Sequence, residues 1–362
     1  MCALLYYFVK PRARGTDTVD LILVVTAALE KKETIYLFTP RSGGADEVSK
    51  LRRKHERLCV KGQKNVTFGR NHHAMKDDRF IVGLGEILWD KFPTGKRLGG
   101  APANFAYHAG QFGHESLVVS AIGHDKDGAD IVKELEKHNL AYHLDRVSYK
   151  TGTVQVDMAD PNAPKYTIRR PVAWDHIPFT DEIKAIAENT KAVCFGTLAQ
   201  RGLESRRTIR LFLDNTPEDC LKICDINLRQ AFFNKAIIQE SLRRADILKL
   251  NEEELPVITQ LLDYQLAGEE VLCRRLMRAY KLHMIILTKG VHGSWVLWKD
   301  GKSFQSTPKV KVVSAVGAGD AFTGAFIGSY LNGASIQEAH ETAVKVSAFV
   351  CTRKGAMPEV KL

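Results

Sequence analysis

The sequence predicts an α/β protein built on a mostly parallel central sheet. Apolar runs with the length of buried strands recur along the chain and alternate with helical patterns, which is typical of successive βαβ units. The expected strands cover residues 80–85, 117–123, 192–196, 222–227, 246–251 and 284–290. In open sheets of this kind ligands bind beside the carboxyl ends of the strands, so polar residues that follow these runs are candidates for a site.

Two helices can be placed between the first strands. The helix expected over residues 102–113 has Pro102 in its first turn and Gly113 just past its end, and both residues are favoured at those positions. A second helix is expected over residues 127–139. Neither an internal repeat nor a low-complexity tract interrupts this pattern.

A β-hairpin is expected around residues 150–170. Two alternating runs there flank the turn sequence 160-DPNAP-164, which predicts two strands joined by a long turn. A hairpin inserted into a parallel α/β domain is a candidate lid over a ligand site, or an extension of a sheet edge.

Composition and charge limit the class of protein. The chain has 362 residues, 44% hydrophobic and 26% charged, as in soluble globular proteins. Residues 1–74 hold a net charge of +7 and residues 75–362 only +3, so the basic excess lies outside the part with the motifs and argues against a nucleic-acid partner. We expect residues 1–74 to be a poorly ordered extension or the result of a wrongly chosen start, and residues 75–362 to form one complete domain.

The cysteines and the apolar runs near the start of the chain indicate in which cellular compartment the protein is expected. Seven unevenly spaced cysteines form neither a disulfide framework nor a paired CxxC metal site. The apolar runs 3–9 and 21–29 are well short of the roughly 20 residues that a membrane helix needs. The first run is followed rather than preceded by basic residues, unlike a signal peptide. These features predict reduced thiols, a cytoplasmic protein and no membrane partner.

The stretch 316-VGAGDAFTG-324 places one carboxylate directly after a glycine turn, where a helix begins. No GxxxxGK[ST] loop occurs, so phosphate binding must come from another glycine turn. The N–H groups of Gly317, Ala318, Gly319 and Asp320 are expected to converge and to stabilise an anion that forms during a reaction. The Asp320 carboxylate is placed to take the proton of an attacking hydroxyl. Taken alone, the pattern also fits a capped helix start whose dipole favours an acid.

Helical spacing of apolar residues continues past Asp320. Gly324 and Gly328, one turn apart in this helix, lower its propensity but allow a neighbouring backbone to approach closely. The dipeptide 332-NG-333 predicts where the helix ends.

Other motifs also stand at the ends of expected strands. They are Asp90, the stretch 99-GGAPANFAYHAGQFG-113, the stretch 225-DINLR-229 and the stretch 250-LNEEEL-255. In this combination and order, the sequence resembles the PfkB (ribokinase-like) carbohydrate kinases, most of all their fructokinase branch. The resemblance covers residues 80 to about 358. It implies a ribokinase-like three-layer αβα sandwich with a small β lid, a monomer or homodimer, and ATP with Mg²⁺ as cofactors.

The resemblance also implies roles for individual residues. The catalytic base is Asp320, with the N–H groups of residues 317–319 as the anion hole. Sugar hydroxyls are held by Asp90, Gly99, Gly100 and Asn104. The ATP-binding residues are Arg229, Asn251, Glu254, Thr288, Gly290 and Gly293. Glu254 helps to hold Mg²⁺ through water, and the segment 347–356 lies beside the adenine.

One departure from the family concerns the residues before the glycine turn. Family members usually have Asp-Thr there, and this chain has Ser314-Ala315. The acid commonly helps to hold a monovalent cation beside the anion hole. We therefore expect weak potassium activation with the base intact.

Several residues near these motifs have two interpretations. Glu86 is either a strand-end hydrogen-bonding group or a direct participant. His108 is more often a packed or surface histidine than a ligand, and Trp89 is expected in the core rather than on the substrate.

The sequence thus predicts an ATP-dependent kinase for a small sugar, with the 6-hydroxyl of fructose as the expected acceptor. Another sugar or sugar acid, such as ribose or 2-keto-3-deoxygluconate, is the alternative within the class. A sugar-binding regulator on the same fold is the alternative outside it, and such a protein would be expected to lack Asp320 or a glycine of the turn.

Overall fold

The computed structural model describes residues 25–26, 35–36, 79–157 and 165–360. The chain divides into two units, which meet in sequence at Met75 and Lys76. In the first unit, the strands β1 (Val25–Thr26) and β2 (Ile35–Tyr36) pair antiparallel. The expectation about residues 1–74 otherwise falls outside the described residues and stays a prediction.

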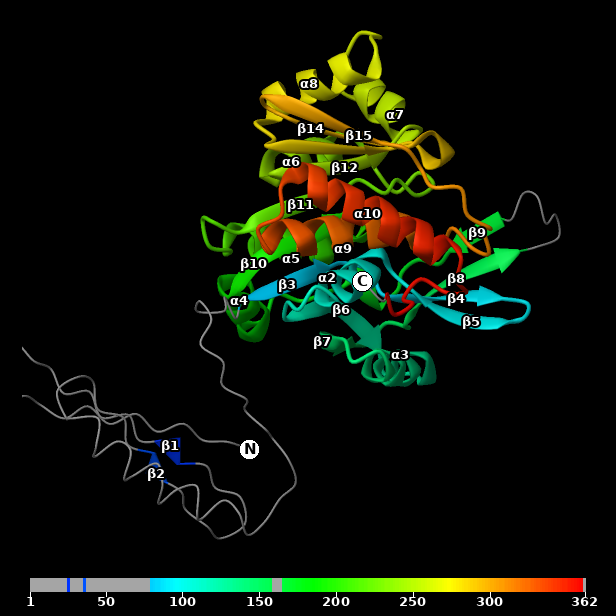
Figure 1. Cartoon of the computed structure of the whole chain (residues 1–362). Helices are drawn as coiled ribbons and strands as arrows, with labels where there is room; N and C mark the ends of the chain where they lie inside the picture. The colour runs from blue at the N-terminus through cyan, green and yellow to red at the C-terminus, as the bar shows by residue number, and fades with distance from the viewer. Residues whose placement is uncertain (1–24, 27–34, 37–78, 158–164, 361–362) are drawn as a thin grey trace, which may run out of the picture. The chain divides into compact units, whose positions relative to one another are not determined.

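A nine-stranded sheet forms the middle of the second unit, in the order β15-β14-β13-β12-β11-β10-β3-β6-β7 (Figure 1). Pairing is parallel from β7 to β13, and β14 and β15 are added antiparallel. The strands are β3 (Phe80–Leu84), β6 (Ser116–Gly123), β7 (Ala141–Val147), β10 (Thr190–Gly196), β11 (Leu221–Asp225), β12 (Ile247–Asn251), β13 (Met284–Thr288), β14 (Ser294–Trp298) and β15 (Gly301–Gln305). All six predicted strands are present, which confirms the mostly parallel α/β fold.

Helices cover both faces of this sheet and make three layers. One face carries α4 (Asp181–Glu188), α5 (Leu203–Asp214), α6 (Lys235–Arg244), α7 (Glu254–Leu261) and α8 (Glu269–Tyr280). The other carries α2 (Ala101–Gly110), α3 (Lys126–Lys137), α9 (Ala318–Leu331) and α10 (Ile336–Cys351). Short 3-10 turns are η1 (Ala173–Asp175), η2 (Leu198–Arg201) and η3 (Gly290–His292). None of the helices in the described residues is both long and apolar enough to cross a membrane.

The two faces of the sheet bury separate cores. Adjacent strand residues such as Ile81 and Val82, or Cys194 and Phe195, point into opposite cores, and all four are almost fully buried. Because each strand is covered on both sides, its sequence is apolar without alternation. The continuous apolar runs were therefore the right signal for these strands.

A smaller four-stranded sheet, in the order β5-β4-β8-β9, projects from the central sheet (Figure 1). Its strands are β4 (Leu88–Phe92), β5 (Gly95–Gly99), β8 (Gly152–Asp157) and β9 (Lys165–Ile168). Strands β8 and β9 pair antiparallel, as predicted for the hairpin, and its turn at 158–164 lies outside the described residues. The β4–β5 hairpin was not predicted, because its strands are short and rich in charge.

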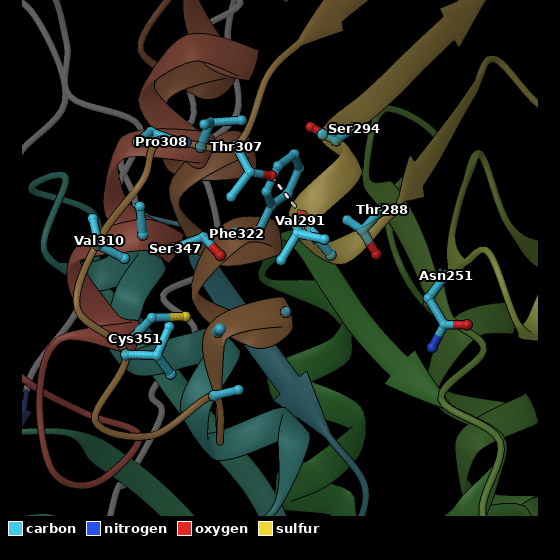
Figure 2. Close-up of a pocket in the computed structure, with 18 of the residues that line it drawn as sticks. Asn251, Thr288, Val291, Ser294, Thr307, Pro308, Val310, Phe322, Ser347 and Cys351 are labelled. Carbon is cyan, nitrogen blue, oxygen red and sulfur yellow. Dashed lines mark hydrogen bonds between the residues drawn. The ribbon is translucent and has the colours of Figure 1, made fainter.

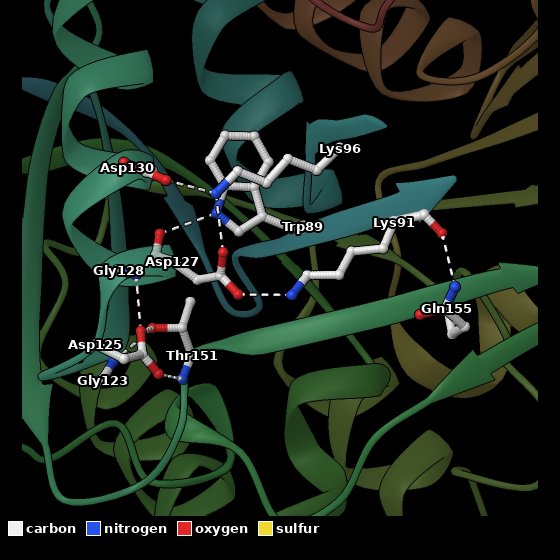
Figure 3. A network of polar contacts seen from close by, with 10 residues as sticks. All are labelled: Trp89, Lys91, Lys96, Gly123, Asp125, Asp127, Gly128, Asp130, Thr151 and Gln155. Carbon is white, nitrogen blue, oxygen red and sulfur yellow. Dashed lines mark hydrogen bonds and ion pairs between the residues drawn. The ribbon is translucent and has the colours of Figure 1, made fainter. Parts of the chain in front are cut away.

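Ion pairs join this small sheet to the N-terminal turns of α3 (Figure 3). Lys91 Nζ lies 2.7 Å from Asp127 Oδ2, while Lys96 Nζ lies 2.9 Å from Asp127 Oδ1 and 2.6 Å from Asp130 Oδ2. The indole N–H of Trp89 donates to the backbone oxygen of Asp127 at 2.9 Å. Trp89 is buried in the core, as expected. The strands β4 and β5 of the small sheet are therefore held to α3 by several polar contacts.

The helices α2 and α9 pack closely because of two glycines. A Cβ atom at Gly324 would lie 2.7 Å from the backbone oxygen of Phe105, and one at Gly328 would lie 2.8 Å from the Phe112 ring. Both contacts are too short for a side chain; at Gly324 this confirms the predicted close approach of a neighbouring backbone, whereas Gly328 is approached by an aromatic side chain. This packing brings Asn104 of α2 to Asp320 of α9.

Candidate active site

The glycine turn before α9 has the conformation that an anion hole needs. Gly317 adopts a left-handed φ of 79°, and a Cβ atom there would lie 2.4 Å from Ala356 Cβ. The Ala318 N–H donates to the Ala315 oxygen at 3.2 Å, which differs from the expectation that it faces the reaction. Among the described residues, the N–H groups of Gly317, Gly319 and Asp320 have no such partner. The turn thus offers three free donors at the positive end of a 14-residue helix.

The carboxylate of Asp320 is oriented by a neighbouring helix. Asn104 Nδ2 donates to Asp320 Oδ2 at 2.8 Å. Burial, together with the Asp225 carboxylate, raises the pKa of Asp320 to about 6, against the opposing effect of Lys249 and of the Asn104 hydrogen bond. A carboxylate in this range is ionised near neutral pH yet basic enough to accept a proton.

A cavity of about 720 Å³ opens in front of Asp320, under the small sheet. Its walls include Asp90 of β4, Asn104 of α2 and Arg229 after β11, all predicted site residues. Burial raises the pKa of Asp90 to about 6, although Arg229 and Arg97 oppose the shift. Apolar side chains of the small sheet, among them Val154 and Ile168, also line this cavity.

The glycine pair predicted at the sugar site shapes this cavity. A Cβ atom at Gly99 would lie 2.6 Å from Asp90 Oδ2, and one at Gly100 would lie 2.4 Å from the backbone oxygen of Glu86. Gly100 also has a φ of 119°, which disfavours other residues. These glycines therefore let the start of α2 approach Asp90 and Glu86.

A buried ion pair supports the glycine turn from beneath, and it was not predicted. Lys249 Nζ lies 3.0 Å from Asp225 Oδ2, and both side chains are almost fully buried. Burial alone lowers the pKa of Lys249, but Asp225, Glu254 and Asp320 raise it overall, so the ammonium stays charged. A Cβ atom at Gly319 would lie 3.1 Å from Lys249 Nζ. A lysine inside the apolar strand run 246–251 was the available signal for this pair.

The predicted residues Asn251 and Glu254 tie two strand-end loops together. Glu254 accepts the N–H of Leu228 at Oε1 and that of Asn251 at Oε2, both at 2.8 Å. The Asn251 side chain in turn accepts the N–H groups of Glu253 and Glu254. The described residues contain no group of three His, Cys, Asp or Glu side chains that could hold a metal ion. Each Glu254 oxygen keeps a further lone pair, so the carboxylate fits a water-mediated contact to Mg²⁺ better than direct ligation.

A second cavity of about 790 Å³ is also lined by residues of the turn, Ala318 and Gly319, and Figure 2 shows other side chains of its wall. The predicted nucleotide residues Thr288, Gly290 and Gly293 line it. Opposite them lie residues of the predicted 347–356 segment, Ser347, Ala348 and Cys351. The side chains of Val291, Pro308, Val310, Val312, Phe322 and Val344 make much of the remaining wall apolar.

The two cavities meet at a common wall. Asn251, Thr288, Ala315 and Gly319 line both of them. Asp320 and Arg229 line only the first cavity, under the small sheet. A group that passes from one cavity to the other therefore passes the free N–H groups of the turn and arrives beside the Asp320 carboxylate.

The chain segment before the turn carries no carboxylate, as the sequence indicates. The N–H groups of Val313 and Ser314 donate to the Cys351 oxygen at 2.8 and 3.2 Å, and Ser314 Oγ accepts the N–H of Val316 at 3.3 Å. A neutral hydroxyl therefore stands next to the turn.

His108 supports the turn indirectly. The ring is fully buried, with Nε2 2.8 Å from the backbone oxygen of Ala356 and Nδ1 3.1 Å from Gln111 Nε2. Burial lowers its pKa to about 4, so it is neutral. The expectation of a packed histidine is confirmed, and the packing fixes the loop that contacts Gly317.

Similar proteins are carbohydrate kinases. The sequence model of the pfkB family carbohydrate kinases matches residues 58–361. An ATP-dependent 6-phosphofructokinase from Thermoanaerobacterium thermosaccharolyticum is 26% identical over 315 residues, 81% of this chain and 95% of the relative. A fructokinase from Escherichia coli is 28% identical over 307 residues, which cover 76% of this chain and 94% of the relative. A 5-dehydro-2-deoxygluconokinase from Bacillus cereus is 24% identical over 255 residues, which cover 67% of this chain and 76% of the relative.

A solved structure with the same fold is the fructokinase of Vibrio cholerae with fructose, ADP and calcium bound. It superposes with a TM-score of 0.66 and 23% identity, over 78% of this chain and 96% of that protein. The three-layer sandwich with its small sheet is thus the ribokinase-like fold, and the two adjoining cavities suit a sugar kinase. The chain belongs to the pfkB family of carbohydrate kinases.

Proposed function

We propose that this sugar kinase transfers the γ-phosphoryl group of ATP to the 6-hydroxyl of fructose. The observation that carries the proposal is the position of Asp320, which lines one cavity directly after Gly319, a residue of the wall that both cavities share. ATP occupies the cavity lined by Thr288, Gly290 and Gly293, and the sugar occupies the one lined by Asp90 and Asn104.

Each side chain has one part in the transfer. The sugar oxygen attacks the γ-phosphorus while its proton moves to the Asp320 carboxylate, and the bond from the γ-phosphorus to the bridging oxygen breaks to release ADP. The N–H groups of the turn stabilise the charge on the phosphoryl oxygens. Arg229 and the buried Lys249, which line the same cavity as Asp320, add positive charge near that position. Glu254 would hold Mg²⁺ through water, and the bound ion would neutralise further phosphate charge.

The charges in the acceptor cavity favour a neutral sugar over an acidic one. The carboxyl groups of Glu86, Asp90, Glu254 and Asp320 line it, against the cations Arg229 and Lys249. Lys249 is already paired with Asp225. A sugar acid or sugar phosphate would bring further negative charge toward these carboxyl groups, whereas hydroxyls donate hydrogen bonds to them.

The test is a phosphorylation panel with the purified chain, ATP and Mg²⁺. The acceptors are fructose, ribose, 2-keto-3-deoxygluconate and fructose 6-phosphate, the last because one relative is a 6-phosphofructokinase. We expect kcat/KM for fructose to exceed the others by at least about tenfold, which is about 1.4 kcal/mol of transition-state binding. A higher value for either anionic acceptor would contradict the proposal, as would the absence of any phosphorylated product.

A further inference from the structure

The carboxyl group of Glu86 is buried in the acceptor site without a donor for one of its oxygens. Glu86 follows β3 after Gly85 and is only 3% exposed. Its Oε2 has no hydrogen-bond partner within the described part of the chain. The residue lines the same cavity as Asp90 and Asp320. A buried acceptor without a donor is unusual in a folded protein and requires an explanation.

Asn104 provides a second acceptor of the same kind. Its Nδ2 is occupied by Asp320, but its Oδ1 is buried and, like Glu86 Oε2, has no partner in the described residues. Both side chains belong to the wall of one cavity. The two missing donors therefore point to one ligand that carries at least two hydroxyl groups, which is the chemistry of a polyol.

The charged groups around Glu86 make its ionisation sensitive to that ligand. Burial raises the pKa of Glu86 to about 7; Arg229 opposes this shift, and Asp320 and Asp225 add to it. The other ionisable groups of the cavity are Asp90, Lys249 and Glu254. In the free enzyme the Glu86 carboxyl is therefore partly protonated near neutral pH. A donated hydrogen bond stabilises the charged form and lowers the pKa.

From this geometry, we propose that Glu86 is a further acceptor-binding residue, whose carboxylate receives a hydroxyl of the sugar next to the one received by Asn104 Oδ1. The inference rests on the proposed sugar-kinase function of the same site. It assigns to Glu86 the direct role that its sequence position left undecided.

The experiment compares acceptor binding in wild type, Glu86→Gln and the control Glu115→Gln. Glu115 is exposed and outside the cavity, so its substitution removes the same charge elsewhere. Calorimetry with fructose, without nucleotide, should show about tenfold weaker binding for Glu86→Gln, because an amide oxygen is a weaker acceptor than a carboxylate. The nucleotide affinity of Glu86→Gln should equal that of wild type, and so should the fructose affinity of Glu115→Gln. Equal fructose affinity in Glu86→Gln and wild type would overturn the inference.

Proton release gives a second readout that needs no variant to fold. At about pH 7, titrations in buffers of different ionisation enthalpy should show wild type releasing about half a proton when fructose binds. Asp90 and Asp320, with pKa values of about 6, are then mostly ionised and contribute less. No proton release from wild type that binds fructose would overturn the inference, whereas a wild type that neither binds nor phosphorylates a sugar would overturn the proposed function instead.

The melting temperature of Glu86→Gln distinguishes a binding role of Glu86 from a purely structural one. The pKa of Glu86 is raised in the folded state, so its ionisation opposes folding as the pH rises from about 4.5 toward 7, and the substitution removes this penalty. Without ligand at about pH 8, Glu86→Gln should therefore melt at the same or a higher temperature than wild type. A lower melting temperature at every pH would assign Glu86 to the core and overturn the inference.

Discussion

The two cavities on either side of the glycine turn are similar in size and different in chemistry. The acceptor cavity carries Glu86, Asp90 and Asp320, each with a pKa raised by burial. The cavity proposed for the nucleotide is lined by four valines and Phe322, with Glu252, Glu253 and Lys309 as its charged residues. Under the proposed function, the acceptor is therefore recognised through hydrogen bonds and charge, and the nucleotide mainly through shape and apolar contact. Substitutions should therefore affect the two ligands separately.

The largest expected effect is on turnover alone. Asp320→Asn keeps the shape of the turn and removes the base, so kcat should fall by about two to four orders of magnitude. Nucleotide affinity should stay within about twofold, because Asp320 does not line the nucleotide cavity. The measurement is steady-state kinetics together with nucleotide titration. A near-normal rate would remove Asp320 from the mechanism.

The acidity of the acceptor cavity should appear in the pH profile. Asp320 must be ionised to act as base, and its pKa is about 6, so activity is present above that pH and lost below it. We expect kcat/KM for the acceptor to begin to fall below about pH 7, where Glu86 becomes protonated, and to fall by about tenfold or more per pH unit below 6, where Asp320 and Asp90 are protonated as well. A rate that stays constant from pH 7 to 5 would mean that the base is not a carboxylate in this environment.

A steric change in the nucleotide cavity should have the opposite selectivity. Ser347→Trp places a large ring among the side chains drawn in Figure 2, so the KM for ATP should rise by about tenfold or more. The KM for the acceptor, measured at saturating ATP, should change less than about twofold. Lys345→Trp, an exposed position on the same helix, is the matched control. A larger effect on the acceptor than on ATP would show that the cavities are not independent.

The smallest expected effect concerns potassium. Ser314 and Ala315 supply no carboxylate beside the turn, so activity in potassium should exceed that in a bulky ammonium buffer by less than about threefold, under about 0.7 kcal/mol. The double substitution Ser314→Asp with Ala315→Thr should increase this ratio. Strong potassium activation of the unmodified chain would mean that backbone oxygens alone complete a cation site.

The sequence predicted the features that depend on residues close to one another in the chain. The buried strands are continuous apolar runs, and Gly317 stands where only a left-handed residue can turn into the helix. The Lys249–Asp225 pair could not be placed, because its partners are adjacent only through the pairing of β11 with β12. The bond from Ala318 to Ala315 depends on the exact path of the turn, which composition does not fix. The unpaired oxygens of Glu86 and Asn104 could not be predicted either, because they depend on how separate segments pack into one cavity wall.

The hydrogen bond between Asn104 and Asp320 joins residues 216 positions apart. Such a contact forms only after a long loop has closed, and long-range contacts slow folding. During refolding, helical structure can form before α2 and α9 have docked, whereas the oriented base requires that docking. Recovery of catalytic activity should therefore lag behind recovery of the helical signal, which makes turnover a kinetic reporter of the final assembly of the domain.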